Sequence, residues 1–212
     1  MLKKYSYWLT DQHFKKFFVR MHKNSLDLLE VLFDAIFYAQ LKPSVKKKGC
    51  GKLLLDLDSV QRIFFFSEKQ YFSFYFPFSV EDEREKLMFY FEKDKQIDVL
   101  EILALQSVLE YYREHDKMDI ISYLQESDDF SRTSLNYEKI EYIFRKLVCM
   151  EFGYVRYDWD KTNENKRIHP LHHLDIDLSD SSTFKVGLDK KISNEEFVDI
   201  FKSDVDCWYL KK

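Results

Sequence analysis

The chain has 212 residues, of which 45% are hydrophobic and 33% are charged, and its formal net charge is −4. This composition excludes both an intrinsically disordered chain and a membrane-embedded one, and the length suits one large domain or a large and a small one. The negative net charge argues against phosphate binding by the whole surface, although a local basic groove stays open.

Turn-forming residues and cysteines are both scarce. Glycine and proline number only 4 and 3, while aromatic residues reach 17%, and this balance favours long helices over many-stranded architectures. The cysteines, Cys50, Cys149 and Cys207, are too far apart to indicate a disulfide framework or a zinc module. Because no apolar run is long enough to cross a bilayer, we expect a soluble protein with reduced cysteines, located in the cytoplasm.

Two helices are predicted in the first forty residues, at 10–23 with Thr10 as N-cap and at 25–41 with Ser25 as cap. The segment 42–52 (KPSVKKKGCGK) reads as a solvated basic loop, because GCGK lacks the spacing of a phosphate-binding loop. If this loop binds nucleic acid, its lysines are the candidates. They are Lys46, Lys47, Lys48 and Lys52.

An aromatic-rich, β-like insertion follows near 53–78. Its aromatic side chains could stack on nucleobases next to the basic loop. A hydrophobic core or a partner interface is the simpler interpretation, with Phe74 and Phe76 as the partner-binding candidates.

The remaining chain divides into a helical and a β-rich part. Helices are predicted at 79–93, 98–115, 116–127 and 136–150, and period-two strands at 153–160, 172–178 and 183–188 before a closing helix at 193–205. The fold prediction is therefore a mostly helical α+β protein, with residues 1–150 helical apart from the insertion. Residues 151–212 form a small antiparallel β-β-β-α region, and the two regions make one continuous domain.

The segment richest in potential catalytic and metal-binding residues is RIHPLHHLDIDL, at 167–178. If its strand pairs with 153–160, one face collects Arg156, Asp158, His173 and Asp175, with cross-strand neighbours roughly 5 Å apart. An imidazole and carboxylates suit a divalent metal, Mg²⁺, Mn²⁺ or Zn²⁺, and an arginine suits a phosphate. Catalytic candidates are Arg156, Asp158 and His173. Metal-ligand candidates are His169, His173 and Asp175.

A second interpretation assigns no function to this face. An antiparallel sheet with one face in water shows alternating polar residues without any function, and Arg156 with Asp158 would then be a surface ion pair of little energetic consequence. The spacing H-P-L-H-H also matches no established metal-binding motif. For catalysis we therefore favour the solvent-facing strand.

Residues 154–201 resemble the C-terminal part of an uncharacterised family of bacterial proteins, which carries R-Y-D-x-D, a short polar loop and H-P-x-x-H-L. Asp175 stands where that pattern has a further histidine, and His172 lies outside the pattern. The resemblance implies a component of a genome-defence or mobile-element system, without implying an activity. The positions carried over are Arg156, Tyr157, Asp158, Asp160, His169, Pro170, His173 and Leu174.

The leading functional prediction is a soluble bacterial accessory or effector protein of an anti-phage defence or mobile-element system, which acts by protein or nucleic-acid contacts. One alternative is a metal-dependent nuclease or phosphodiesterase that uses the face of Arg156, Asp158, His173 and Asp175. Another is a purely structural subunit. The partners expected are another protein subunit or a second copy of the chain, and nucleic acid through the basic loop, but no membrane.

Overall fold

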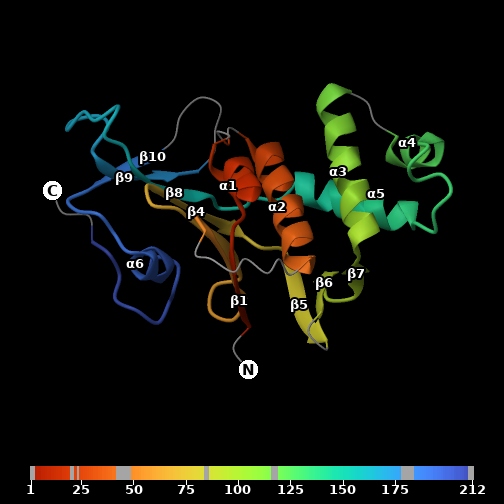
Figure 1. Ribbon diagram of the computed structural model, residues 1–212, viewed down its shortest axis with the longest axis horizontal. Helices are drawn as coiled ribbons and strands as arrows, with labels where there is room; N and C mark the ends of the chain where they lie inside the picture. Colours follow the sequence, from red (N-terminus) through yellow and green to blue (C-terminus); the bar gives the residue numbers. More distant parts are fainter. Residues whose placement is uncertain are drawn as a thin grey trace. The chain divides into compact units, whose positions relative to one another are not determined.

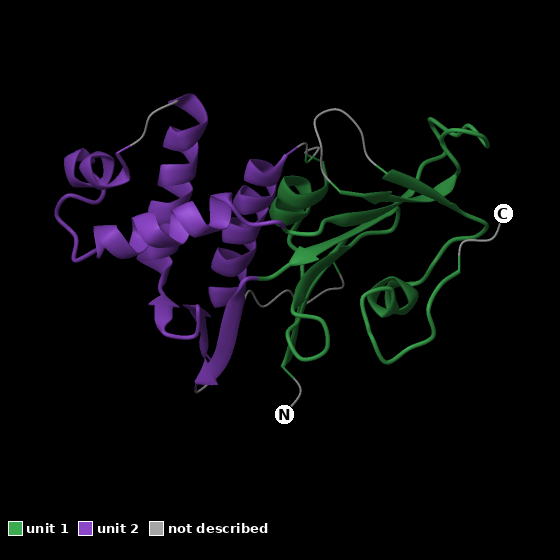
Figure 2. Ribbon diagram, turned by 180° about the vertical axis from the view of Figure 1, so that it is seen from behind, with its two compact units in different colours: residues 1–23, 45–76, 152–212 green, residues 24–44, 77–151 purple. Residues whose placement is uncertain are grey.

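The chain divides into two compact units, each assembled from separate stretches of sequence (Figures 1 and 2). Unit 1 comprises Met1–Lys23, Val45–Phe76 and Phe152–Lys212, and unit 2 comprises Asn24–Ser44 and Pro77–Glu151. The computed structural model describes residues 3–19, 22, 24–41, 49–83, 86–115, 119–177 and 184–209.

The prediction of a mostly helical protein is wrong. The described residues are 35% helical and 28% strand, and they form a seven-stranded and a three-stranded antiparallel sheet. The scarcity of glycine was misleading because non-glycine residues occupy the left-handed region at several connections. These residues are Gln61, Glu92, Lys93 and Asp177, with φ between 50° and 71°.

The seven-stranded sheet belongs to unit 1 and runs in the order β1-β2-β3-β4-β8-β9-β10. Every neighbouring pair is antiparallel. The predicted strands near 153–160, 172–178 and 183–188 are therefore confirmed, but they extend a larger sheet, because β4 pairs with β8. The strands are β1 (Lys4–Trp8), β2 (Lys52–Asp56), β3 (Arg62–Phe66), β4 (Gln70–Tyr75), β8 (Val155–Trp159), β9 (His172–Ile176) and β10 (Phe184–Leu188).

Two helices cover opposite sides of this sheet (Figure 1). Helix α1 (Asp11–Phe18) begins at the predicted N-cap Thr10 and places Phe17 against Phe65, with ring centroids 4.9 Å apart. Helix α6 (Asn194–Asp199) begins with a capping box between Ser193 and Glu196. It covers the other face with a buried core cluster. The members of this cluster are Phe64, Phe66, Tyr71, Tyr157, Leu174, Ile192, Phe197 and Val198.

Unit 2 contains four of the predicted helices and one element that was mispredicted. The predicted helix at 79–93 is replaced by strands at 78–83 and 86–91, because the buried Leu87, Phe89 and Phe91 alternate with partly exposed residues. The acidic run 81–83 resembles a helix start but ends a strand. The elements are α2 (Ser25–Gln40), β5 (Phe78–Glu83), β6 (Lys86–Phe91), β7 (Lys95–Ile97), α3 (Val99–Glu114), α4 (Ile120–Glu126) and α5 (Tyr137–Val148).

Helix α2 starts one residue earlier than expected, since Asn24 is its N-cap and accepts a hydrogen bond from the Asp27 amide. Among the helices of the described chain, none is long and apolar enough to cross a membrane.

The connection between β8 and β9 folds back over the sheet. The Asp160 amide donates to the Leu171 carbonyl at 3.0 Å and closes the loop at its base. Near its end, Pro170 lies on Gly187 of β10, where an added Cβ would come within 2.9 Å of Pro170 Cγ. Glycine at 187 therefore permits the close approach of this loop, which we call the β8–β9 loop.

Replacement of Phe197 by alanine is expected to lower the free energy of unfolding by about 3–5 kcal/mol, because a fully buried ring is lost from the α6 face. The matched control is Phe184→Ala, which removes a ring that is 78% exposed and should change stability by less than about 0.5 kcal/mol. Urea denaturation followed by circular dichroism measures both. Equal losses would contradict the described core.

A second prediction concerns the loop contact. Gly187→Ala should destabilise the protein by about 1–3 kcal/mol, because the new methyl group meets the rigid ring of Pro170. The double variant Gly187→Ala/Pro170→Ala removes the atom in closest contact and should recover part of this loss. Strictly additive effects in urea denaturation would show that Pro170 is not the obstacle.

Candidate functional site

The register of three neighbouring strands brings the predicted site residues together. Arg156 of β8 lies opposite Asp175 of β9, and Asp158 lies opposite His173. On the other side of β9, Asp175 lies opposite Lys185 of β10. The interpretation of a solvent-facing strand is wrong for this face, since His173 is 0% and Asp175 1% exposed.

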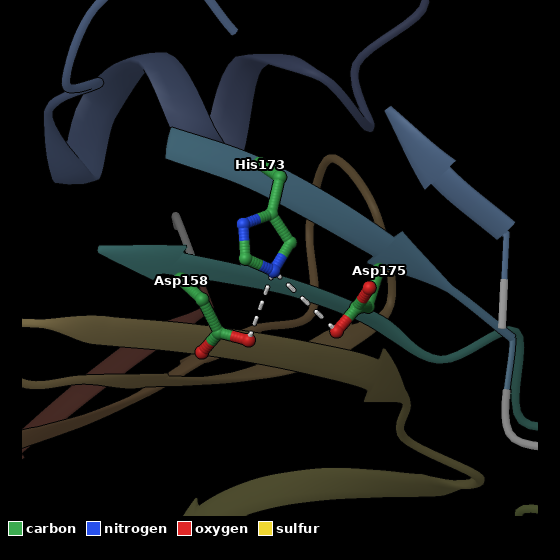
Figure 3. A group of neighbouring side chains, drawn as sticks. All are labelled: Asp158, His173 and Asp175. Carbon is green, nitrogen blue, oxygen red and sulfur yellow. Dashed lines mark ion pairs between the residues drawn. The ribbon is translucent and has the colours of Figure 1, made fainter. Parts of the chain in front are cut away.

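Three donor atoms form the centre of the site (Figure 3). His173 Nε2 lies 3.7 Å from Asp158 Oδ2 and 3.8 Å from Asp175 Oδ2, and the three side chains offer ligand atoms within 4.8 Å of one another. We call Asp158, His173 and Asp175 the three-donor cluster. Such a set of one nitrogen and two oxygens fits a divalent transition metal.

The orientation of the His173 ring is fixed by the β8–β9 loop. Its Nδ1 is 2.8 Å from the carbonyl oxygen of Pro170, which can only accept, so Nδ1 carries the proton. In the neutral ring, Nε2 therefore presents its lone pair toward the two carboxylates. A backbone carbonyl that holds the other nitrogen is the usual arrangement behind a metal-ligating histidine.

Two cations hold the carboxylates. Arg156 donates from Nε to Asp158 Oδ2 at 2.7 Å and from Nη2 to Asp175 Oδ2 at 2.5 Å. Lys185 donates to Asp175 Oδ1 at 2.6 Å, and its Nζ lies 3.5 Å from His173 Nε2. Two positive and two negative charges thus balance in a largely buried group. Burial alone would lower the pKa of Arg156, but Asp158 and Asp175 outweigh it and raise that pKa.

Lys185 was missed by sequence reasoning. Its signal was the alternation in the strand at 183–188, which places Lys185 and Gly187 on one face, although the pairing partner was unknown. Gln70 was missed as well, and it donates to Asp158 Oδ1 at 2.9 Å. Both oxygens of Asp158 are therefore held by neighbouring side chains.

His169, a predicted metal ligand, lies beside the three-donor cluster but outside it. Its ring meets that of His173 edge-on, with centroids 4.5 Å apart, while its Nε2 lies 3.2 Å from Asp160 Oδ2. Hydrogen bonds from the Asn163 side chain and from the backbone amides of Asn163 and Thr162 hold the pKa of Asp160 at about 2. Asp160 therefore organises the β8–β9 loop.

The other predicted sites lie elsewhere. Lys46, Lys47 and Lys48 fall outside the described residues, and Lys52 begins β2, opposite Trp8. Phe74 and Phe76 are 0% exposed, so they are core residues and do not form a partner surface. His172 points away from the three-donor cluster, since its Nδ1 is 2.8 Å from the Tyr157 hydroxyl on the α6 side of the sheet.

A pocket of about 580 Å³ opens beside the cluster. Arg156 and Asp158 belong both to the pocket wall and to the buried ion group, so the pocket gives a ligand access to that group. Its lining residues are Phe14, Phe18, Val19, His22, Ser67, Glu68, Lys69, Gln70, Tyr154, Arg156, Asp158, Trp159, Asp160, Lys161 and Thr162.

Comparisons with known proteins assign no family to this arrangement. No family model matches the sequence, and neither the curated proteins nor the solved structures contain a significant match. The resemblance to a bacterial family at 154–201 is not tested by these comparisons and stays a prediction.

Proposed function

We propose that the protein is a metal-dependent phosphodiesterase in which Asp158, His173 and Asp175 hold a divalent cation. One observation carries the proposal: three donor atoms, from the buried His173 and Asp175 and the partly buried Asp158, lie within 4.8 Å of one another beside a pocket, and the histidine is oriented by the Pro170 carbonyl. Three protein ligands leave a coordination position for water or substrate, as catalytic metal sites require.

The chemistry follows from the donor set and its neighbours. A divalent metal held by Asp158, His173 and Asp175 would lower the pKa of a water bound to it and so provide the nucleophile for hydrolysis of a phosphodiester near neutral pH. One water would be consumed: its oxygen would replace the ester oxygen on phosphorus and one of its protons would go to the leaving oxygen, giving a phosphomonoester and an alcohol. Arg156 lies at the pocket wall, where its guanidinium can stabilise the charge on the phosphoryl oxygens.

The Lys185 ammonium group would have to move before a metal could bind at the three-donor cluster. Its ammonium group lies between Asp175 Oδ1 and His173 Nε2, close to the place that a cation bound by the three-donor cluster would occupy. A divalent ion and an ammonium group repel each other at such distances. The Lys185 side chain is 31% exposed on the edge strand β10, so it can turn toward solvent when a metal binds.

These contacts favour hydrolysis over the other predicted functions. The partner interface lost its support when Phe74 and Phe76 proved to be buried. A role as an accessory or effector protein in genome defence, drawn from the resemblance, is compatible with a phosphodiesterase and stays a proposal.

Replacement of His173 by alanine should abolish metal binding and hydrolysis. Loss of a direct ligand should weaken Mn²⁺ or Zn²⁺ binding by more than the roughly 10–100-fold that loss of an outer-shell partner causes. Titration calorimetry measures the affinity, and release of nitrophenol from bis(4-nitrophenyl) phosphate measures the activity. The matched control is His172→Ala, whose ring lies on the opposite face. Metal-dependent activity that survives in a folded His173→Ala variant would refute the proposal.

Removal of the competing ammonium group gives a second test. Lys185→Met keeps the length of the side chain but removes the charge, so metal affinity should rise by about tenfold or more. If the charged side chains form only a structural ion cluster, the result should be the opposite. Asp175 would lose a partner, the free energy of unfolding would fall and no metal would bind. Calorimetric titration with Mn²⁺, together with urea denaturation, separates these two outcomes.

A further inference from the structure

Tyr154 lines the pocket and carries a buried hydroxyl group that the site described so far does not use. The side chain is 2% exposed and lines the pocket next to β8. Its hydroxyl lies near the Arg156 guanidinium, which can only donate, so the hydroxyl proton has no acceptor within the described part of the chain. Burial of an unsatisfied hydroxyl is unfavourable, and a ligand that accepts this proton would remove the penalty.

The neighbour of this hydroxyl defines the chemistry of the acceptor. Arg156 follows two residues later and lines the same pocket. It holds the carboxylates through Nε and Nη2, so its Nη1 end is the part that a ligand can contact. A hydroxyl proton and a guanidinium side by side suit an anionic oxygen, and a guanidinium is well matched to phosphate.

Another part of the pocket lining is aromatic. Phe14 and Phe18 come from successive turns of α1, both are half-buried, and their rings stack with centroids 4.9 Å apart. A flat base can lie against such rings, and stacking of this kind tolerates any base. The volume of about 580 Å³ is within the range of small-molecule sites.

The charges of the lining favour a small ligand over a long polyanion. Its basic residues are matched by equally many acidic ones, so the pocket does not attract negative charge throughout. Arg156 is the lining cation that also belongs to the buried ion group, and a metal at the three-donor cluster would strengthen phosphate binding beside it. The basic lining residues are Lys69, Arg156 and Lys161, and the acidic ones are Glu68, Asp158 and Asp160.

We propose that this pocket binds a nucleotide, whose phosphate contacts Tyr154 and Arg156 and whose base lies against Phe14 and Phe18. The inference rests on the proposed function and names its substrate class, a nucleotide phosphodiester. Tyr154 then acts as a substrate-binding residue.

The test is calorimetric titration of the full chain with adenosine 5′-monophosphate and with inorganic phosphate, each with EDTA and with Mn²⁺. The monophosphate is a product of diester hydrolysis, so the enzyme does not consume it. The wild type should bind it at least tenfold more tightly than phosphate, and Mn²⁺ should increase both affinities. Because this comparison needs no variant, it tests the proposal even where a substitution prevents folding.

Two variants locate the contacts. Tyr154→Phe should weaken binding of both probes about tenfold and leave the Mn²⁺ affinity unchanged. Phe14→Leu should weaken only the binding of the monophosphate, by about fivefold or more. Tyr157→Phe is the matched control, because it removes a hydroxyl from β8, the strand that follows Tyr154, on the opposite face, where that group bonds to His172.

The outcomes separate this inference from the proposed function. Equal affinities of the wild type for the two probes, or a Tyr154→Phe variant that binds like the wild type, would overturn the nucleotide pocket. Metal-dependent cleavage that is lost in His173→Ala would then still support the phosphodiesterase. Conversely, monophosphate binding that depends on Tyr154 and Phe14 without any metal-dependent cleavage would support the pocket and refute the phosphodiesterase.

Discussion

The site depends on the register between β8 and β9. With Arg156 opposite Asp175 and Asp158 opposite His173, all four side chains point to the same face. A shift of either strand by one residue would turn its polar side chains into the apolar face beneath α6. Tyr157 and Leu174, which belong to the core cluster on that face, hold the register against such a shift. The apolar side of the sheet thus fixes the geometry of the polar side.

Because the polar face is largely buried, its charged side chains need partners of opposite charge. Carboxylates as enclosed as Asp175 are tolerated only with charged or hydrogen-bonding partners, and Arg156 and Lys185 meet this requirement. Because Arg156 and Lys185 balance the two carboxylates, the group can fold without a metal. If the proposed metal binds, Lys185 competes with it, so metal affinity and stability would be coupled through the same side chain.

The local pattern of the last third of the chain was readable from sequence, since strict alternation and a capped helix predict β-β-β-α. The pairing of β4 with β8 could not be predicted, because no local sequence pattern connects strands that are some eighty residues apart. Without this pairing, the face of Arg156 and Asp158 looked like the wet side of an edge strand. The hairpin of β5 and β6 was hidden by an acidic run that resembles a helix start.

Within the site, the four alternating residues could be predicted, but Lys185, Gln70 and Tyr154 could not. Each becomes relevant only through a neighbour in space, and none belongs to a motif. Phe74 and Phe76 show the converse, since aromatic residues in a strand look alike in sequence whether they face a partner or the core. Only the burial of the side chain distinguishes the two cases, and burial depends on how the whole sheet is assembled.

The discontinuity of unit 1 bears on how the protein is made. Its sheet needs strands from the beginning, the middle and the end of the chain, whereas every segment of unit 2 has been synthesised before β8 emerges. Contacts between such distant segments form slowly, because closing a long loop costs entropy before pairing compensates for it. During translation, β4 must wait with an unpaired edge until β8 leaves the ribosome. Its aromatic side chains make that interval the period of greatest risk of misfolding and aggregation.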